Sequence, residues 1–377
     1  MAETHSHAYV KTELTPDLPP PANTVGFVGW ARANLFSSWW NTLLTFIGVY
    51  ILYLILPGLI EFAFIDAVWT GDSREACLGP DVGACWPFIE AKFGQIIYGR
   101  YPIEERYRVD ICYFVGLAGL IALAVPGIPF KKWTGIFMLV PYPIMTFYLL
   151  VGDAFGLPYV ETALWGGLLV TLVVAISGIV ASLPIGVLLA LGRRSQMPLV
   201  RYFCVAFIEF WRGVPLITVL FMASVLLPLF LPEDVSFDKL LRALIGVALF
   251  ASAYLAEVVR GGLQAIPRGQ YEGAMALGLS YWRMMGLIVL PQALKMVIPG
   301  IVNTFIGLFK DTTLVLIIGL FDLLGIVQLN FTDSNWSTPV TSHTGYLFVA
   351  VIFWIFCFGM SRYSAYMEEK LHTGHKR

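Results

Sequence analysis

The chain alternates between long runs of apolar residues and short stretches that hold most of its charges. A helix needs about 20 mostly apolar residues to cross a bilayer, and eight stretches approach that length. The sixth leaves only 14 residues between Arg242 and Glu257, but charged side chains at its ends can reach the membrane surface. We therefore predict an all-α integral membrane protein with about eight transmembrane helices, over residues 33–60, 111–130, 133–152, 162–192, 202–232, 243–256, 284–309 and 334–361.

Lysine and arginine concentrate in every second connection between these predicted spans. They fall in 130–133, 192–201, 260–283 and the C-terminal end, and alternate with acidic connections at 151–162 and 232–239. Short basic connections stay on the cytoplasmic side, so eight spans place both termini inside and residues 61–110 outside. We expect residues 1–32 to be a disordered cytoplasmic tail and residues 366–377 a second cytoplasmic tail.

The composition is typical of a membrane protein and excludes some classes of function. Only 13% of the residues are charged, against about 25% in soluble domains. The net charge is −1, so the protein has no overall positive field that would attract nucleic acid. None of the five cysteines lies in a CxxC arrangement, and the histidines form no metal-ligand pair, so we expect no bound metal.

Two cysteines, Cys77 and Cys85, lie eight residues apart in the predicted external loop. Compartments outside the cytoplasm favour disulfide formation. We predict a disulfide between them, and the alternative is a pair of free thiols.

A short segment rich in small residues occupies the predicted cytoplasmic connection 261–286. Pro267 can begin a helix there at position N1, and Gly278 can end it at position C′. An isolated helix of about ten residues is marginal in water, so it needs a partner, and its small side chains allow close approach. Ser280 can cap the next helix, and Pro291 can kink it. A plain connector between two spans remains the alternative.

The spacing in this connection resembles the EAA signature of ABC-importer permeases. Glu272-Gly273-Ala274 is followed by three residues and Gly278, and nine further residues lead to Ile288-Val289-Leu290-Pro291. The one departure is Gly273, where the family usually has alanine. Other segments resemble the polar amino-acid branch of that family: GGLLVTL (166–172), WRGVPL (211–216), EVVRGGLQAIPRGQYEGA (257–274), LPQALKMVIPG (290–300) and LFKDTTL (308–314).

The resemblance covers residues 163–365, the last five predicted spans, and implies a type I ABC-importer (MetI-like) permease core. Residues 33–152 would then be a three-helix extension with the external loop 61–110. The whole chain is most similar to the longer permease subunit of Gram-negative general L-amino-acid transport systems. The implied function is a membrane-spanning permease subunit that translocates L-amino acids across the bacterial inner membrane.

The resemblance also implies the partners. They are a second permease subunit, favoured as a paralogue over an identical copy, two cytoplasmic ABC ATPase subunits, a periplasmic amino-acid-binding protein and membrane lipid. The chain has no G-x-x-x-x-G-K-[ST] phosphate-binding motif. We therefore expect no cofactor on this chain and no enzyme activity of its own, with ATP and Mg²⁺ on the partner ATPase. The residues implied in ATPase coupling are Tyr271, Glu272, Gly273, Ala274, Ala276, Leu277 and Gly278.

Charged residues at membrane depth are candidates for the substrate path. Residues 312–321 form a ten-residue apolar run that is too short to span, so we expect a buried or re-entrant helix on the outer side. Lys310 and Asp311 would lie where that segment begins, and their opposite charges suit an α-amino acid. A local ion pair that holds the turn is the alternative. The predicted path or gate residues are Lys310, Asp311, Thr312, Thr313, Arg212 and Thr171, although Arg212 and Lys295 could simply extend to the cytoplasmic surface.

A second class of function is an ion-coupled secondary transporter of small polar solutes. Such proteins place carboxylates or broken helices at mid-membrane and show paired repeats. The long apolar runs hold no central acid, and no internal repeat is evident. A membrane enzyme is a third class, but no nucleophile and base stand out as a pair.

Overall fold

The computed structural model describes residues 26–371 except 126, 231 and 233–236, and it divides into two compact units, residues 1–67 and 68–377. Every regular element in the described part is a helix, and only isolated β-bridges accompany them. The all-α prediction is confirmed. Six described helices are long and apolar enough to cross a membrane, or up to eight if each of two bent pairs forms one span.

The first unit contains α1 (Gly26–Asn34) and α2 (Trp39–Ile60), which continues as a π-turn over Glu61–Ile65. The Ser38 hydroxyl accepts a hydrogen bond from the Asn41 amide at 3.2 Å, which caps α2. The predicted disordered tail is therefore too long, because residues 26–34 are helical, while residues 1–25 lie outside the described residues.

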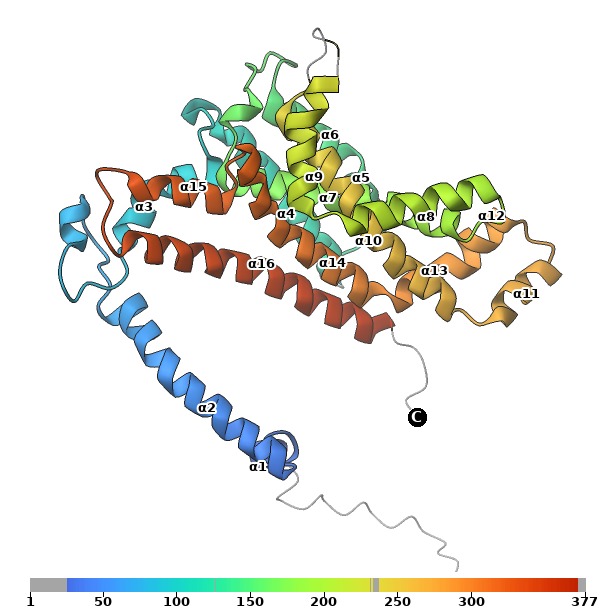
Figure 1. Ribbon diagram of the computed structural model, residues 1–377, viewed down its shortest axis with the longest axis horizontal. Helices are drawn as coiled ribbons and strands as arrows, with labels where there is room; N and C mark the ends of the chain where they lie inside the picture. Colours follow the sequence, from blue (N-terminus) through green and yellow to red (C-terminus); the bar gives the residue numbers. More distant parts are fainter. Residues whose placement is uncertain (1–25, 126, 231, 233–236, 372–377) are drawn as a thin grey trace, which may run out of the picture. The chain divides into compact units, whose positions relative to one another are not determined.

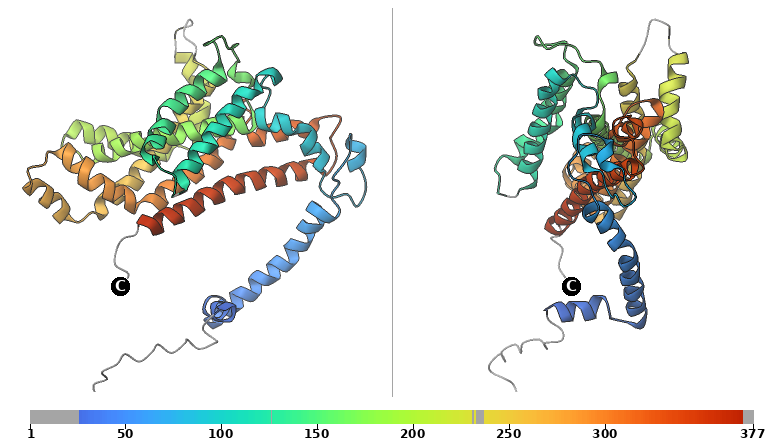
Figure 2. Two further views of the ribbon diagram at one scale, coloured as in Figure 1. Left: turned by 180° about the vertical axis from the view of Figure 1, so that it is seen from behind. Right: turned by 90° about the vertical axis from the view of Figure 1, so that its left-hand side faces the viewer.

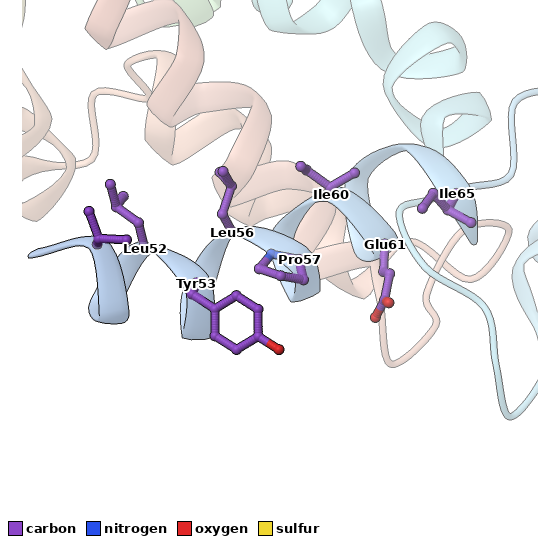
Figure 3. A pocket seen from close by; sticks show the side chains of 8 residues that line it. Leu52, Tyr53, Leu56, Pro57, Ile60, Glu61 and Ile65 are labelled. Atoms are coloured by element: carbon purple, nitrogen blue, oxygen red, sulfur yellow. The ribbon is translucent and has the colours of Figure 1, made fainter. Parts of the chain in front are cut away.

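A shallow apolar groove runs along α2 (Figure 3) and is lined by Val49, Leu52, Tyr53, Leu56, Pro57, Ile60, Glu61 and Ile65.

The second unit begins with a compact segment that includes a 3₁₀ turn (Arg74–Cys77) and α3 (Trp86–Tyr98). Cys77 and Cys85 form a disulfide with a Cα–Cα distance of 5.7 Å. Both cysteines are buried against Phe88, Ile89 and Ile326. Residues 68–98 of the predicted external loop 61–110 thus fold around this disulfide.

Replacing both Cys77 and Cys85 by serine should lower the free energy of unfolding of this segment by about 2–3 kcal/mol in the chain-entropy model for so short a loop. Limited proteolysis between residues 68 and 98 should speed up. Thiol labelling of the denatured protein without reductant provides the check, because burial no longer protects the thiols, and labelling of both cysteines in the wild-type protein would contradict the bond. Cys204, a free buried cysteine, serves as the matched control for labelling.

The next three helices are α4 (Arg106–Ala124), α5 (Lys131–Leu139) and α6 (Pro141–Val151). The span that contains α4 starts at Ile103, eight residues before the predicted start at 111. Charges are tolerated in its first turns because they have partners. Arg108 lies 2.5 Å from Glu105, and Tyr98 donates to Asp110 at 2.6 Å. α5 and α6 form one predicted span but are bent by 41°.

Three helices then form the centre of the unit: α7 (Gly167–Arg193), α8 (Pro198–Gly213) and α10 (Lys239–Ala265). Between α8 and α10 lies α9 (Leu216–Phe221), which continues as a π-turn (Met222–Leu226) and a 3₁₀ turn (Leu227–Phe230). The predicted fifth span is bent by 102° between α8 and α9, because Pro215 lacks the amide that would continue α8. The predicted sixth span proves to be a full 27-residue helix.

The remaining elements are α11 (Arg268–Ala276), α12 (Tyr281–Met284), a π-turn (Met285–Val289), α13 (Leu290–Met296), α14 (Ile298–Asp311), a 3₁₀ segment (Thr312–Ile318), α15 (Leu323–Leu329), a 3₁₀ turn (Asn330–Thr332) and α16 (Thr341–Leu371). The prediction of a buried or re-entrant helix over 312–321 holds only in part, because residues 312–318 bury Thr312, Val315 and Ile318 but do not turn back. The 3₁₀ segment continues α14, and the two together form the span Ile298–Ile318. The predicted span 284–309 instead contains a π-helical segment ahead of Pro291 and is interrupted at Val297. α16 also runs into the predicted tail 366–377, of which residues 372–377 lie outside the described residues.

In the second unit α10 packs against α7, α8, α13 and α14, and the buried residues form three clusters in the described part. One buried cluster combines Val109 and Leu150 of the predicted extension with Leu169, Val219 and Val247 of the predicted core. The compact units therefore divide at residue 67 rather than between 152 and 163. In Figures 1 and 2, α11 and α12 lie at one end of this unit, and α3 and α15 lie at the opposite end.

Candidate functional site

The end of α11 is fixed by two backbone hydrogen bonds that surround a glycine. The Gly278 amide donates to the Met275 carbonyl at 2.9 Å, and the Leu279 amide donates to the Ala274 carbonyl at 3.2 Å. This pair of bonds is a Schellman motif, which requires a left-handed residue at C′. Gly278 has φ +71°, as the sequence predicted. Pro267 is the N-cap residue rather than N1, and Ser280 precedes α12 without a side-chain capping bond.

The structure separates the seven predicted coupling residues into two faces of α11. Ala274 is buried, and Tyr271 packs with it and with Leu279 in a core cluster. These two of the predicted coupling residues attach α11 to its own chain and are not on its exposed side. The outward face is formed by the exposed residues Glu272, Gly273, Met275, Ala276, Leu277 and Gly278.

The outward face is shaped by its glycines. A Cβ atom added at Gly273 or at Gly278 would meet nothing within 4 Å, so neither glycine is needed for packing inside the chain. Leu277 is 78% exposed and Met275 is 58% exposed. Two large apolar side chains beside small residues at an exposed helix end form a surface suited to a partner that approaches closely.

Arg194 and Tyr271 attach α11 to the ends of two long helices. The Arg194 Nη1 donates to the Leu263 carbonyl at 2.9 Å and to the Tyr271 hydroxyl at 3.1 Å. The Tyr271 hydroxyl in turn donates to the same carbonyl at 3.1 Å, and the guanidinium lies 5.6 Å from the Tyr271 ring centroid. A force applied to α11 would therefore reach α7 and α10 directly.

A cluster of charges joins α7, α8 and α10 near the same end. Glu257 contacts Arg260 at 2.7 Å and Arg193 at 2.9 Å, and Arg193 also contacts Glu209 at 3.0 Å. Arg212, a predicted path residue, lies 3.8 Å from Glu257 and 5.7 Å from the Tyr254 ring centroid. Because the Glu257 side chain is only 15% exposed, these arginines compensate a largely buried charge. Arg212 is therefore partnered within the chain.

The predicted pair Lys310 and Asp311 lies within the helix Ile298–Ile318, which is long and apolar enough to span, rather than at its end. No contact within 4.0 Å joins the two side chains in the part of the chain that the structure describes, although the Lys310 charge still acts on the Asp311 carboxyl through space. Lys310 is exposed and Asp311 is half-buried. The Thr312 and Thr313 hydroxyls donate to the carbonyls of Phe309 and Lys310, at 2.8 and 2.9 Å, and stabilise the change from α-helix to 3₁₀.

Thr171, the last predicted path residue, is completely buried and ties α7 to α15. Its hydroxyl accepts from the Leu323 amide at 2.9 Å and donates to the Gly167 carbonyl at 3.2 Å. The Gly167 amide donates to the Phe321 carbonyl at 2.9 Å. Gly167 has φ +62°, and a Cβ there would lie 2.0 Å from the Ile96 carbonyl oxygen. Thr171 and Gly167 therefore support the junction of two helices and do not line an open path.

Asp322, beside this junction, is a buried acid that the sequence reading missed. Its two carboxylate oxygens accept from the amides of Gly325 and Leu324, at 3.0 and 3.2 Å, and cap α15. Burial raises the pKa of Asp322 from 3.8 to about 6, although the two amide bonds oppose the shift. The available signal was an aspartate immediately before an apolar helical run.

The raised pKa of Asp322 makes a testable contribution to stability. The folded state binds this proton more tightly than the unfolded state, so the contribution is fully present below pH 3.8 and is lost as the pH rises through about 6. The shift corresponds to about 3 kcal/mol. Asp322→Asn should flatten the fall in melting temperature of the purified protein between pH 4 and pH 7, whereas Asp81→Asn, at an exposed acid, should not. An unchanged slope in Asp322→Asn would contradict the assignment.

Comparison with known proteins places this arrangement in a family. Residues 182–373, about half of the chain, match the family described as binding-protein-dependent transport system inner membrane component. The chain belongs to this family. The permease is 52% identical over 359 residues to the inner membrane amino-acid ABC transporter permease protein YhdY of Escherichia coli strain K12, which covers 95% of this chain and 97% of that protein.

Two further matches cover different shares of the chain. The permease is 40% identical over 443 residues to the glutamate/glutamine/aspartate/asparagine transport system permease protein BztC of Rhodobacter capsulatus, over 98% of this chain and 99% of that protein. A crystal structure of an amino acid ABC transporter with histidines is 26% identical, with a TM-score of 0.47, and covers 54% of this chain and 92% of that chain.

The family match and the two relatives confirm the ABC-importer permease recognised from the EAA spacing. The chain is a multi-pass inner membrane protein and a permease subunit of a binding-protein-dependent transport system. The alternative of an ion-coupled secondary transporter is not supported.

Proposed function

We propose that the permease translocates L-amino acids across the inner membrane as one of two membrane subunits of an importer. Relatives named for amino-acid transport match nearly its whole length. The partner subunit is a paralogue, an external amino-acid-binding protein delivers the substrate, and two ATPase subunits bind ATP and Mg²⁺. Both termini then lie on the cytoplasmic side, together with α11.

The observation that carries the proposal is the outward face of α11. This face is exposed in the chain, and its boundary is set by a Schellman motif. α11 is attached through Tyr271 and Arg194 to α7 and α10. We infer that the outward face docks on the ATPase, and that closure of the ATPase moves these two helices.

Lys310 and Asp311 complete the proposal as residues of the substrate path. A cation exposed inside a membrane span needs a carboxylate or water nearby, and the described chain provides Lys310 with no ion pair. The α-carboxylate of the substrate, or an acid on the second permease, would supply it. Asp311 can pair with the α-amino group.

Reconstituted transport tests the function. Proteoliposomes that contain both permeases and the ATPase should accumulate labelled amino acid only with ATP, Mg²⁺ and the binding protein. Omission of the ATPase is the matched control. Uptake that persists without the ATPase and follows an imposed sodium or proton gradient would overturn the importer and support an ion-coupled transporter.

A further inference from the structure

Residues 68–98, which we call the disulfide module, form an addition to the family core. The family match begins at residue 182, so the module lies outside it. YhdY and BztC nevertheless match over 95% and 98% of this chain. The module therefore belongs to a longer type of permease and needs a role beyond the translocation core.

The module is fastened to the connection between α15 and α16 by three polar contacts. Lys92 Nζ lies 2.5 Å from Asp333, the Cys85 amide donates to the Thr344 hydroxyl at 2.9 Å, and the Arg74 amide donates to the Asn335 carbonyl at 2.9 Å. Trp336 from that connection is buried in the same cluster as Cys77 and Cys85. Movement of the module would therefore move the ends of α15 and α16.

The exposed surface of the module is the loop 69–82. The disulfide links Cys77 of this loop to Cys85, just after it. This loop lies at the end of the second unit opposite α11 (Figures 1 and 2). Trp69 is 54% exposed and Leu78 is 51% exposed. Around them three exposed acids, Asp72, Glu75 and Asp81, outnumber the one exposed base, Arg74. Apolar anchors within a charged rim are typical of a protein interface.

The charge of the loop decides which kind of partner fits. Anionic lipid headgroups attract lysine and arginine, so they would repel a surface with two more acids than bases. A protein with a basic face is attracted to it and would bind faster at low salt. The family depends on a binding protein, and the proposed function places that protein on the external side, opposite α11.

We propose that loop 69–82 is a docking surface for the external solute-binding protein, which contacts it through a basic face. The contacts with Asp333, Asn335 and Thr344 then carry the effect of docking to α15 and α16. This inference rests on the importer function proposed above, because that function supplies the binding protein and places α11 inside.

The test uses the assembled importer in nanodiscs, with the triple variant Asp72→Lys, Glu75→Lys, Asp81→Lys. None of these acids makes an ion pair in the described chain, so the fold should survive. The dissociation constant of the binding protein should rise at least about tenfold, which is 1.4 kcal/mol. Stimulation of ATP hydrolysis by the binding protein should fall, while basal hydrolysis should not change. Glu104→Lys, at an exposed acid outside the loop, is the matched control.

Three outcomes are distinguished. Weaker binding by the triple variant alone, with a reduced salt dependence, supports the docking surface. Wild-type affinity in the triple variant overturns it and leaves the importer function standing. Absence of any binding by the wild-type importer overturns the proposed function and this inference with it.

Discussion

Gly278→Asp should leave the permease in the membrane and abolish ATPase docking. The glycine has φ +71°, and the space that a Cβ atom would occupy is open, so the aspartate would not clash within the chain. Its carboxylate would instead enter the proposed contact surface without a partner. An uncompensated charge in such a place costs about 3–5 kcal/mol, which weakens docking by more than about 100-fold.

The measurement combines membrane content, co-purification of the ATPase and ATP-driven uptake. Gly278→Ala separates the backbone effect from the charge, because it strains the left-handed position without adding a carboxylate. Gly273→Ala is the matched control, since it lies within α11 on the same exposed face and should favour the helix by about 1 kcal/mol. Uptake by Gly278→Asp at the wild-type rate would show that α11 does not dock on the ATPase.

Lys310→Met and Asp311→Asn should each assemble with their partners, retain basal ATP hydrolysis and lose transport. Each change removes one side of a charge pair that we place between permease and substrate. Such a loss costs about 2–5 kcal/mol, so uptake at limiting substrate should fall by about 30-fold or more. The loss should differ between acidic and neutral amino acids, because only the acidic ones bring a second carboxylate to the path.

Lys370→Met, at an exposed lysine in the last turn of α16, is the control for loss of a lysine outside the path. Assembly is measured by co-purification and transport by uptake into proteoliposomes. If both path variants fail to assemble, Lys310 and Asp311 have a structural role in the complex and not a role in the substrate path. Normal transport of every substrate by both variants would remove them from the path.

Several features could be predicted from local sequence because local chemistry decides them. Gly278 ends α11 because the left-handed C′ position favours glycine. The spans follow from the length of the apolar runs, since a bilayer excludes unpaired backbone groups. The pairing of Cys77 with Cys85 required only their short separation and an oxidising compartment.

Other features depend on neighbours that are distant in the sequence. Thr171 belongs to a segment similar to those of amino-acid permeases, yet its hydroxyl is used by the Leu323 amide, 152 residues away. Similarly, the sequence shows Glu257 and Arg212 only as charged residues near the ends of predicted spans. The two side chains lie close together because α8 packs against α10. A periodic pattern identifies a helix face without identifying the helix that covers it.

The sequence by itself determined the membrane class, the approximate spans, the bounds of α11 and the permease family. Tertiary structure alone decided which face of α11 is free, since Ala274 turns inward and Gly278 outward only after α11 packs on its own chain. It also decided that the 3₁₀ segment Thr312–Ile318 extends α14. A ten-residue apolar run is too short to span alone, and only its junction with the preceding helix gives it the required length.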